Sequence, residues 1–422
     1  MIFAHGTLLP DDQLPALLAG LEEEINTTRA ALTLEAETVI NAIDALGQKL
    51  DRGELNHLLA QFATPKMLEG LAQIRPSLTR EALELKLYTE LGPDWASLQR
   101  RPFGQARLTP LGTLFHVTAG NVEGLPAFSA VEGLLTGNVN LIKLPREDKG
   151  LTPALLSLLV EEEPRLAPFL YAFDFPSGDA ASMQALADVA DGLVVWGGEA
   201  AVAACRRLAP PGCKLMEWGH RLSFAYISGF ENRKAELTAL ARHIVHTGGL
   251  LCSSCQVIFL DTEDMAQAEA FCQHFLPYLE EAARAHRSLG QRGQSALYAR
   301  EAFLEHVTDR KGRDARFFPG RGCSVTLGAD RELELSPLHG NVLVKCLPRK
   351  ELLSTLRRQK GRLQTAGLLC PPEERAALTD LLARTGLTRI TRAGSMSNTF
   401  PGEGHDGEYP LRRYLRVVDA EQ

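Results

Sequence analysis

The chain has 422 residues, of which 45% are hydrophobic and 23% are charged, and its formal net charge is −7. This length allows two or three domains, each with its own core. The acidic balance argues against a nucleic-acid backbone as a partner. No stretch approaches the roughly 20 uninterrupted apolar residues that span a bilayer, so no membrane span is predicted.

The N-terminal sequence MIFAHGTLLPDDQLPALL contains no basic leader ahead of an apolar core, which predicts a cytoplasmic protein. Cysteines stand at positions 205, 213, 252, 255, 272, 323, 346 and 370. They are too sparse for a disulfide framework and fit a reducing compartment.

Helices are predicted first along the chain, over residues 11–91, where leucine and alanine recur at helical spacing. A proline-containing connection over residues 93–110 follows. Beyond it, the β-like runs LGTLFHV, NVNLIKL, FLYAFDF, GLVVWG and LSFAYIS alternate with helical patterns. Strands that alternate with helices indicate a parallel sheet covered on both faces.

A second α/β set continues from about residue 229, with CQVIFLD, CSVTLG and NVLVKCLP as its strands. We therefore expect a helical N-terminal region (1–105) packed on a first α/β domain (106–228). A second α/β domain (229–395) and a C-terminal segment that returns to the body of the protein (396–422) complete the chain.

The segment HTGGLLCSSCQVIFL places two glycines and two cysteines before a strand. A structural zinc site would need a second ligand pair, and none is present. A redox pair would be expected at the start of a helix, where the helix N-terminus stabilises a thiolate. Two inert, buried cysteines or a catalytic thiol are the remaining alternatives.

The order of AGNVEGLP, GLLTGNVNLIKLP, MEWGH and GGLLCSSCQVIFL resembles the aldehyde dehydrogenase superfamily. Within it, the chain looks closest to the LuxC-like acyl-CoA reductases, which convert fatty acyl thioesters to aldehydes with NADPH. The resemblance extends from Leu111 to the C-terminus. It implies an α/β, aldehyde-dehydrogenase-like fold: a Rossmann-type cofactor domain, then an α/β catalytic domain, with a helical N-terminal region.

Three catalytic residues are implied by this resemblance. Cys252 takes the place of the nucleophile, and Cys255 is expected to pack. Asn121 matches the asparagine of the oxyanion hole, although an asparagine there could equally cap the following helix. Glu217 matches the family's glutamate, but EWGH replaces the usual Gly-Gly pair, so a surface carboxylate stays an alternative.

The resemblance also assigns residues to the cofactor. Lys143 matches the lysine that binds the adenosine ribose, and a solvated lysine at a strand end is the alternative. Arg146 stands where NAD-preferring relatives place a glutamate, which favours the 2′-phosphate of NADPH. Gly197 and Gly198 resemble the diphosphate turn, at which a helix N-terminus binds the anion.

Two further motifs support the reductase interpretation. SPLHGNV resembles a superfamily motif but carries Pro337 in place of the glutamate that holds the nicotinamide ribose. HDGEYPLRRYL resembles the closing motif of LuxC-like reductases. We expect His339, His405 and Asp406 to line the site, or else to be ordinary loop residues.

The leading hypothesis is NADPH-dependent reduction of an acyl thioester to an aldehyde through a cysteine acyl-enzyme. The alternatives are an NAD(P)-dependent aldehyde dehydrogenase that runs oxidatively, and a non-catalytic cofactor-binding partner subunit. Acyl-CoA or a carrier-bound acyl group would be the substrate, and a protein partner could transfer the acyl group. The resemblance also implies a homo-oligomer.

Overall fold

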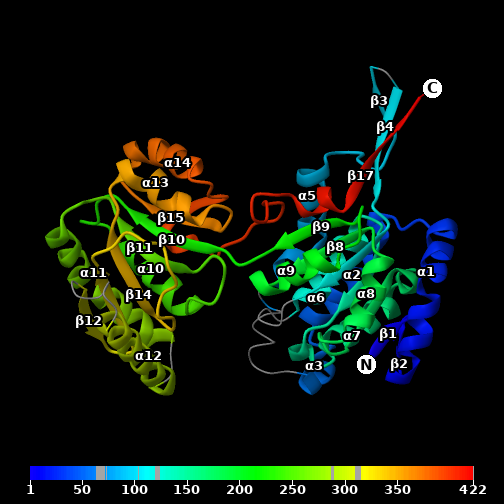
Figure 1. Cartoon of the computed structure of the whole chain (residues 1–422), viewed down its shortest axis with the longest axis horizontal. Helices are drawn as coiled ribbons and strands as arrows, with labels where there is room; N and C mark the ends of the chain where they lie inside the picture. The colour runs from blue at the N-terminus through cyan, green and yellow to red at the C-terminus, as the bar shows by residue number, and fades with distance from the viewer. Residues whose placement is uncertain are drawn as a thin grey trace. The chain divides into compact units, whose positions relative to one another are not determined.

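The computed structural model describes residues 1–62, 72, 74–102, 104–118, 124–286, 289–308 and 315–421. The chain divides into two compact units (Figure 1). Unit 1 comprises residues 1–219 and 400–422, and unit 2 comprises residues 220–399. None of the helices in these described ranges is long and apolar enough to cross a lipid bilayer.

Unit 1 is built on a seven-stranded sheet with the order β2-β1-β7-β6-β5-β8-β9. Strands β7, β6, β5, β8 and β9 are parallel, and β1 and β2 add an antiparallel edge. The strands are β1 (Ile2–Ala4), β2 (Thr7–Leu9), β5 (Thr113–Val117), β6 (Val139–Lys143), β7 (Leu170–Phe173), β8 (Gly192–Trp196) and β9 (Lys214–Trp218). Continuous apolar runs form β5 to β8 because helices bury both faces of a parallel sheet.

The helices of unit 1 include those predicted over residues 11–91. They are α1 (Leu14–Ala31), α2 (Ala36–Asp51), α3 (Asn56–Phe62), α5 (Arg80–Leu91), α6 (Leu125–Leu135), α7 (Leu151–Glu162), α8 (Ala180–Asp188), α9 (Glu199–Leu208) and α15 (Pro410–Arg413). The N-terminal helices share one core cluster with the sheet, so this region and the predicted cofactor domain form a single unit.

Residues 400–422 return to unit 1, as the labels α15 and β17 show in Figure 1. Strand β17 (Leu415–Ala420) pairs antiparallel with β4 (Gly104–Pro110), which also pairs with β3 (Gln99–Arg101). The backbone N–H of Leu411 donates to the buried carboxylate of Glu90 on α5 at 2.8 Å. Segments that are remote in sequence therefore complete unit 1.

Unit 2 contains a second seven-stranded sheet with the order β12-β13-β14-β11-β10-β15-β16. Its strands are parallel except for the β12–β13 pair. They are β10 (Leu222–Ile227), β11 (Cys255–Leu260), β12 (Arg316–Gly320), β13 (Cys323–Gly328), β14 (Asn341–Cys346), β15 (Leu363–Leu369) and β16 (Arg389–Arg392). The helices are α10 (Lys234–Thr247), α11 (Met265–His286), α12 (Leu289–Thr308), α13 (Leu352–Leu356) and α14 (Arg375–Arg384).

Two helical layers cover this second sheet (Figure 1). Alternate side chains of β10 belong to different cores: Phe224 and Tyr226 pack in the cluster that contains α13 and α14 residues, whereas Ala225 and Ile227 pack with α10 and α11. This alternation follows from the two-residue period of a strand. The core of unit 2 is therefore double-sided.

The division between the units differs from the sequence-based boundary after residue 228. Strand β10 lies in unit 2 because it pairs with β11 and β15, so unit 2 starts at His220 instead of residue 229. The second boundary lies between Thr399 and Phe400, instead of after residue 395.

Candidate active site

Unit 1 has a candidate cofactor site at the carboxyl edge of its sheet. From β5 the chain crosses through α6 to β6 on one side, and from β8 it crosses through α9 to β9 on the other. The direction of strand order therefore reverses between the neighbouring strands β5 and β8. Open α/β sheets bind ligands outside the carboxyl ends of their strands at such a reversal. Lys143 ends β6, and Gly197 and Gly198 follow β8, so all three lie at this edge.

Lys143 is buried, with 4% of its surface exposed. Its ammonium group donates to the backbone carbonyl of Leu144 and lies 5.3 Å from the centre of the Phe175 ring. Burial lowers the pKa of Lys143, and the nearby carboxylates of Asp174 and Glu147 oppose that shift. A cation with further N–H donors is thus held at the end of β6.

Arg146 begins the short 3₁₀ helix Arg146–Asp148, and its side chain is exposed. Within the ranges that the structure describes, its guanidinium has no recorded hydrogen bond or ion pair. A guanidinium carries five N–H donors in a planar fork. This arrangement suits the recognition of a phosphate group by arginine.

The turn between β8 and α9 places a glycine at the N-cap of α9. Gly198 is the N-cap residue with extended backbone, and a Cβ built on it would meet no atom within 4 Å. The N–H groups of the first helical turn can therefore face an anion. Together with Lys143 and Arg146, this donor set fits the ribose and phosphate groups of a nicotinamide dinucleotide.

Glu217 lies on β9, where both of its carboxylate oxygens accept from the guanidinium of Arg206 on α9. The side chain of Glu217 is 25% exposed and that of Arg206 is 63% exposed. The carboxylate is thus already occupied by an ion pair at the surface of unit 1. This geometry resembles the surface-carboxylate alternative more than that of a base directed at water.

His405 and Asp406 also belong to unit 1, whereas His339 belongs to unit 2. The ring of His405 lies edge-on to Trp196 and Trp218, with centroid distances of 5.1 and 4.9 Å. These tryptophans end β8 and β9, so His405 is positioned next to the Gly197–Gly198 turn. Asn121, the predicted oxyanion donor, lies outside the described residues, and its role stays a prediction.

A separate candidate site lies in unit 2, at the loop of residues 248–254, here called the thiol loop, which joins α10 to β11. Helix α10 ends at Gly248, which is left-handed with φ 59°, and Gly249 follows with φ 84°. A Cβ on Gly249 would lie 2.8 Å from the side chain of Leu338. Glycine is therefore required by backbone conformation and by space.

The two cysteines of this segment have different surroundings. Cys252 is exposed on the thiol loop, whereas Cys255 starts β11 with 2% of its surface exposed. Burial raises the pKa of the Cys255 thiol to about 12. Because thiolates are the nucleophiles, Cys255 is inert near neutral pH. Of this pair, only Cys252 can meet a substrate.

Ser223 on β10 anchors the backbone of Cys252. Its hydroxyl donates to the carbonyl of Cys252 at 2.6 Å and accepts from the N–H of Thr365 at 3.0 Å. The ladders between β10 and both neighbouring strands shift register beside Ser223. The hydroxyl therefore pairs with a strand N–H and holds the thiol loop at the same point.

Residues 336–340, here called the SPLHG loop, support the thiol loop from within unit 2. The backbone N–H of His339 donates to the carbonyl of Gly248 at 2.8 Å. Gln256 donates to the carbonyl of Gly249 at 2.9 Å and accepts from the N–H and hydroxyl of Ser336, both at 3.0 Å. The SPLHG motif is thus placed against the thiol loop, which its sequence alone did not reveal.

Two supporting residues were absent from the sequence-based site. Ser223 lies within a predicted apolar strand, where a single serine is the available signal. His243 is buried near the backbone of Ser253 in the thiol loop, and burial lowers its pKa to about 4. His243 is therefore neutral near pH 7, and its contact with this loop depends on tertiary packing.

Comparison with solved structures shows that the chain has the aldehyde dehydrogenase fold. The structure is similar to methylmalonate-semialdehyde dehydrogenase from Oceanimonas doudoroffii, with a TM-score of 0.72, 11% identity, and coverage of 100% of this chain and 97% of the other. It is also similar to betaine aldehyde dehydrogenase from Staphylococcus aureus, with a TM-score of 0.70, 14% identity, and coverage of 97% and 87%. The predicted fold class is confirmed.

The sequence model of the acyl-CoA reductase (LuxC) family matches residues 31–417, and the chain belongs to this family. Long-chain acyl-protein thioester reductase from Aliivibrio fischeri is 24% identical, with 93% of this chain and 83% of the relative covered. The protein of the same name from Photorhabdus luminescens is 24% identical, with 92% and 83% covered. The protein is therefore an acyl reductase that forms aldehydes from acyl thioesters, as the sequence predicted. The family also implies a nicotinamide cofactor.

Proposed function

We propose that the chain reduces a CoA- or carrier-bound acyl thioester with NADPH, through an acyl-enzyme on Cys252. The observation that carries this proposal is the exposed thiol of Cys252 on a loop anchored by Ser223. The neighbouring Cys255 is buried, with a pKa raised to about 12, so it does not compete. The names of the relatives point to long acyl chains on a protein thioester.

In the first half of the reaction, the sulfur of Cys252 attacks the thioester carbonyl carbon. The bond from that carbon to the donor sulfur breaks, the donor thiol departs with a proton, and an acyl-enzyme thioester remains on Cys252. Exchange of one thioester for another keeps the carbonyl activated. We assign stabilisation of the intermediate oxyanion to the side-chain amide of Asn121.

In the second half, a nicotinamide cofactor would supply the hydride that reduces the acyl carbon. Cys252 then leaves that carbon as the thiolate, and the aldehyde is released. Lys143 would bind the adenosine ribose, Arg146 the 2′-phosphate, and the Gly197–Gly198 turn the diphosphate. Reduction needs no activated water, which is compatible with the ion pair that holds Glu217.

We further propose a cytoplasmic homo-oligomer that receives its acyl group from CoA, a carrier or an acyl-transferring protein. None of the eight cysteines forms a disulfide, which suits a reducing compartment. Val417 and Val418 on β17 are 62% and 39% exposed, which gives this strand an apolar surface suited to a second subunit. Light scattering of the purified protein measures the assembly, and a monomer at micromolar concentration would contradict this part.

Intact-protein mass spectrometry tests the chemistry. Incubation with tetradecanoyl-CoA in the absence of cofactor should add one acyl group to the wild type and to Cys255→Ser, and none to Cys252→Ser. Added NADPH should then release tetradecanal from the two labelled proteins. Labelling of Cys252→Ser, or a labelled wild type that releases only free acid, would overturn the proposal.

A further inference from the structure

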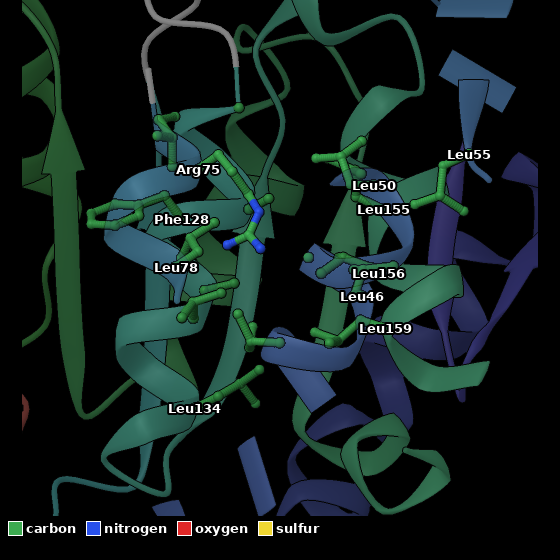
Figure 2. Close-up of a pocket in the computed structure, with 17 residues that line it drawn as sticks. Leu46, Leu50, Leu55, Arg75, Leu78, Phe128, Leu134, Leu155, Leu156 and Leu159 are labelled. Atoms are coloured by element: carbon green, nitrogen blue, oxygen red, sulfur yellow. The ribbon is translucent and has the colours of Figure 1, made fainter. Parts of the chain in front are cut away.

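An apolar cavity of about 90 Å³ lies inside unit 1, between the N-terminal helices and the helices that cover the sheet. Side chains from α2, the 3₁₀ helix Arg75–Leu78, α6 and α7 surround the space (Figure 2). Leu46, Leu78, Phe128 and Leu155 are among the side chains that surround the space. The cavity is therefore separate from the strand edge that carries the proposed cofactor residues.

The accessible wall of this cavity is almost entirely carbon. Among the described residues that line it, Arg75 is the single charged one, and Figure 2 shows its guanidinium among the apolar side chains. Asp51 neutralises Arg75 through contacts of 2.6 and 3.2 Å. The remaining nitrogen, Nη1, is buried and has no hydrogen-bond partner among the described residues. Since the rest of the wall is apolar, the cavity suits an alkyl chain.

The guanidinium of Arg75 also depends on the shape of α2. A Cβ on Gly47 would lie 2.7 Å from the central carbon of this group. Gly47 therefore gives the arginine room to lie flat against the helix. An apolar cavity left empty destabilises a protein because its lining atoms lose contacts, and an alkyl ligand restores them.

The cavity is linked through α6 to the chemistry proposed above. Its lining begins at Gly124, the N-cap residue of α6, and continues along that helix to Leu134. Asn121, the proposed oxyanion donor, precedes Gly124 by three residues in the sequence. One helix therefore carries part of the cavity wall and follows directly on the segment expected to contact the thioester oxygen.

We propose that this cavity binds the alkyl chain of the acyl substrate and sets the preference for chain length. The inference rests on the proposed function, since it assigns a binding site to the substrate of that reaction. Burial of each methylene contributes about a fourfold gain in affinity. A larger side chain in the wall that takes the space of three methylenes should therefore reduce the acylation rate with a long chain by about 60-fold. A chain too short to place methylenes in the cavity should be unaffected.

Ala127→Phe tests this inference, because Ala127 lines the cavity and is half-buried. Ala185→Phe is the matched control: it makes the same substitution at a half-buried site on α8, away from the cavity. Rates of Cys252 acylation are measured with tetradecanoyl-CoA and butanoyl-CoA. We expect Ala127→Phe to lose about 60-fold with the long chain and less than about twofold with the short one. Equal losses, or no loss in a folded variant, would overturn the inference.

A second cavity variant and a direct binding measurement test the same site. Leu155→Trp fills the cavity from α7, and replaces Ala127→Phe if that variant fails to fold. Titration with cis-parinaric acid, which fluoresces in apolar surroundings, reports binding without acylation. If the wild type binds parinaric acid and either cavity variant does not, the site is supported. That conclusion would hold even if no acyl-CoA labelled Cys252, because the missing label would contradict only the proposed reaction. Absence of parinaric acid binding, or binding unchanged in both variants, overturns the site even in an active reductase.

Discussion

Replacement of Ser223 by alanine should weaken unit 2 and slow acylation of Cys252 together. Ser223 is fully buried, and its hydroxyl both donates to the Cys252 carbonyl and accepts from the N–H of Thr365. Alanine leaves a buried strand N–H without its acceptor, which costs about 1–3 kcal/mol. A loss of about 2 kcal/mol lowers Tm by about 4–8 °C in a domain of this size.

The effect on chemistry follows from positioning. The hydrogen bond from Ser223 fixes the backbone of the nucleophile itself, and a misplacement of about 1 Å reduces such a reaction by about 100-fold. We therefore expect acylation by tetradecanoyl-CoA to slow by about 10- to 100-fold, as followed by intact mass against time. Binding of NADPH, measured by fluorescence titration, should change little.

Thr385→Ala is the control for general destabilisation of unit 2. Thr385 is also buried, and its hydroxyl donates to the carbonyl of Leu382 at 2.6 Å, at the end of α14. This variant should lose stability, as measured by scanning calorimetry, and acylate Cys252 at the wild-type rate. A normal acylation rate in Ser223→Ala, or an equal slowing in Thr385→Ala, would refute the positioning argument.

Three other predictions follow from single side chains. Arg146→Glu should weaken NADPH binding by about 1.5–3 kcal/mol and NADH binding much less, as measured by fluorescence titration; equal losses would exclude a contact with the 2′-phosphate. Glu217→Gln should cost less than about 1 kcal/mol of stability, because its partner Arg206 is exposed, and should leave the rate of acyl transfer to Cys252 unchanged in the mass assay. Burial lowers the pKa of His116 to about 4, below the ordinary histidine value near 6.5. The contribution of the neutral ring to protein stability is therefore fully present above pH 6.5 and is lost as the pH falls to about 4. Urea titrations between pH 7 and 4 should show a smaller loss in His116→Gln than in the wild type, and identical losses would contradict this assignment.

Several strands of both sheets were predictable because they are rich in valine, isoleucine and aromatic residues. The runs LGTLFHV, NVNLIKL, GLVVWG and CQVIFLD correspond to β5, β6, β8 and β11. Strand β15 was not predicted, because LQTAGLL contains no valine, isoleucine or aromatic residue. Burial there comes from pairing with β10 and β16, which a local pattern does not contain.

Part of the candidate site could be predicted from the sequence, and part depended on the fold. The glycines of the thiol loop follow local rules of turn conformation, whereas Cys252 was selected through the resemblance to the family, and its catalytic role stays a prediction. The anchors Ser223 and Ser336 come from segments remote in sequence, and their roles depend on which strands and loops are neighbours. The boundary of unit 2 was displaced for the same reason, since LSFAYI fits either sheet until its pairing partners are known.

The return of residues 400–422 to unit 1 determines the order in which the protein can be completed during synthesis. Unit 2 is contained wholly within residues 220–399, so it leaves the ribosome before the last part of unit 1 exists. Until then, the strand edge of β4 lacks β17, and the buried carboxylate of Glu90 lacks the N–H of Leu411. Unit 1 therefore keeps an open strand edge and an incomplete core while all of unit 2 is synthesised. During this interval the chain is most prone to aggregation.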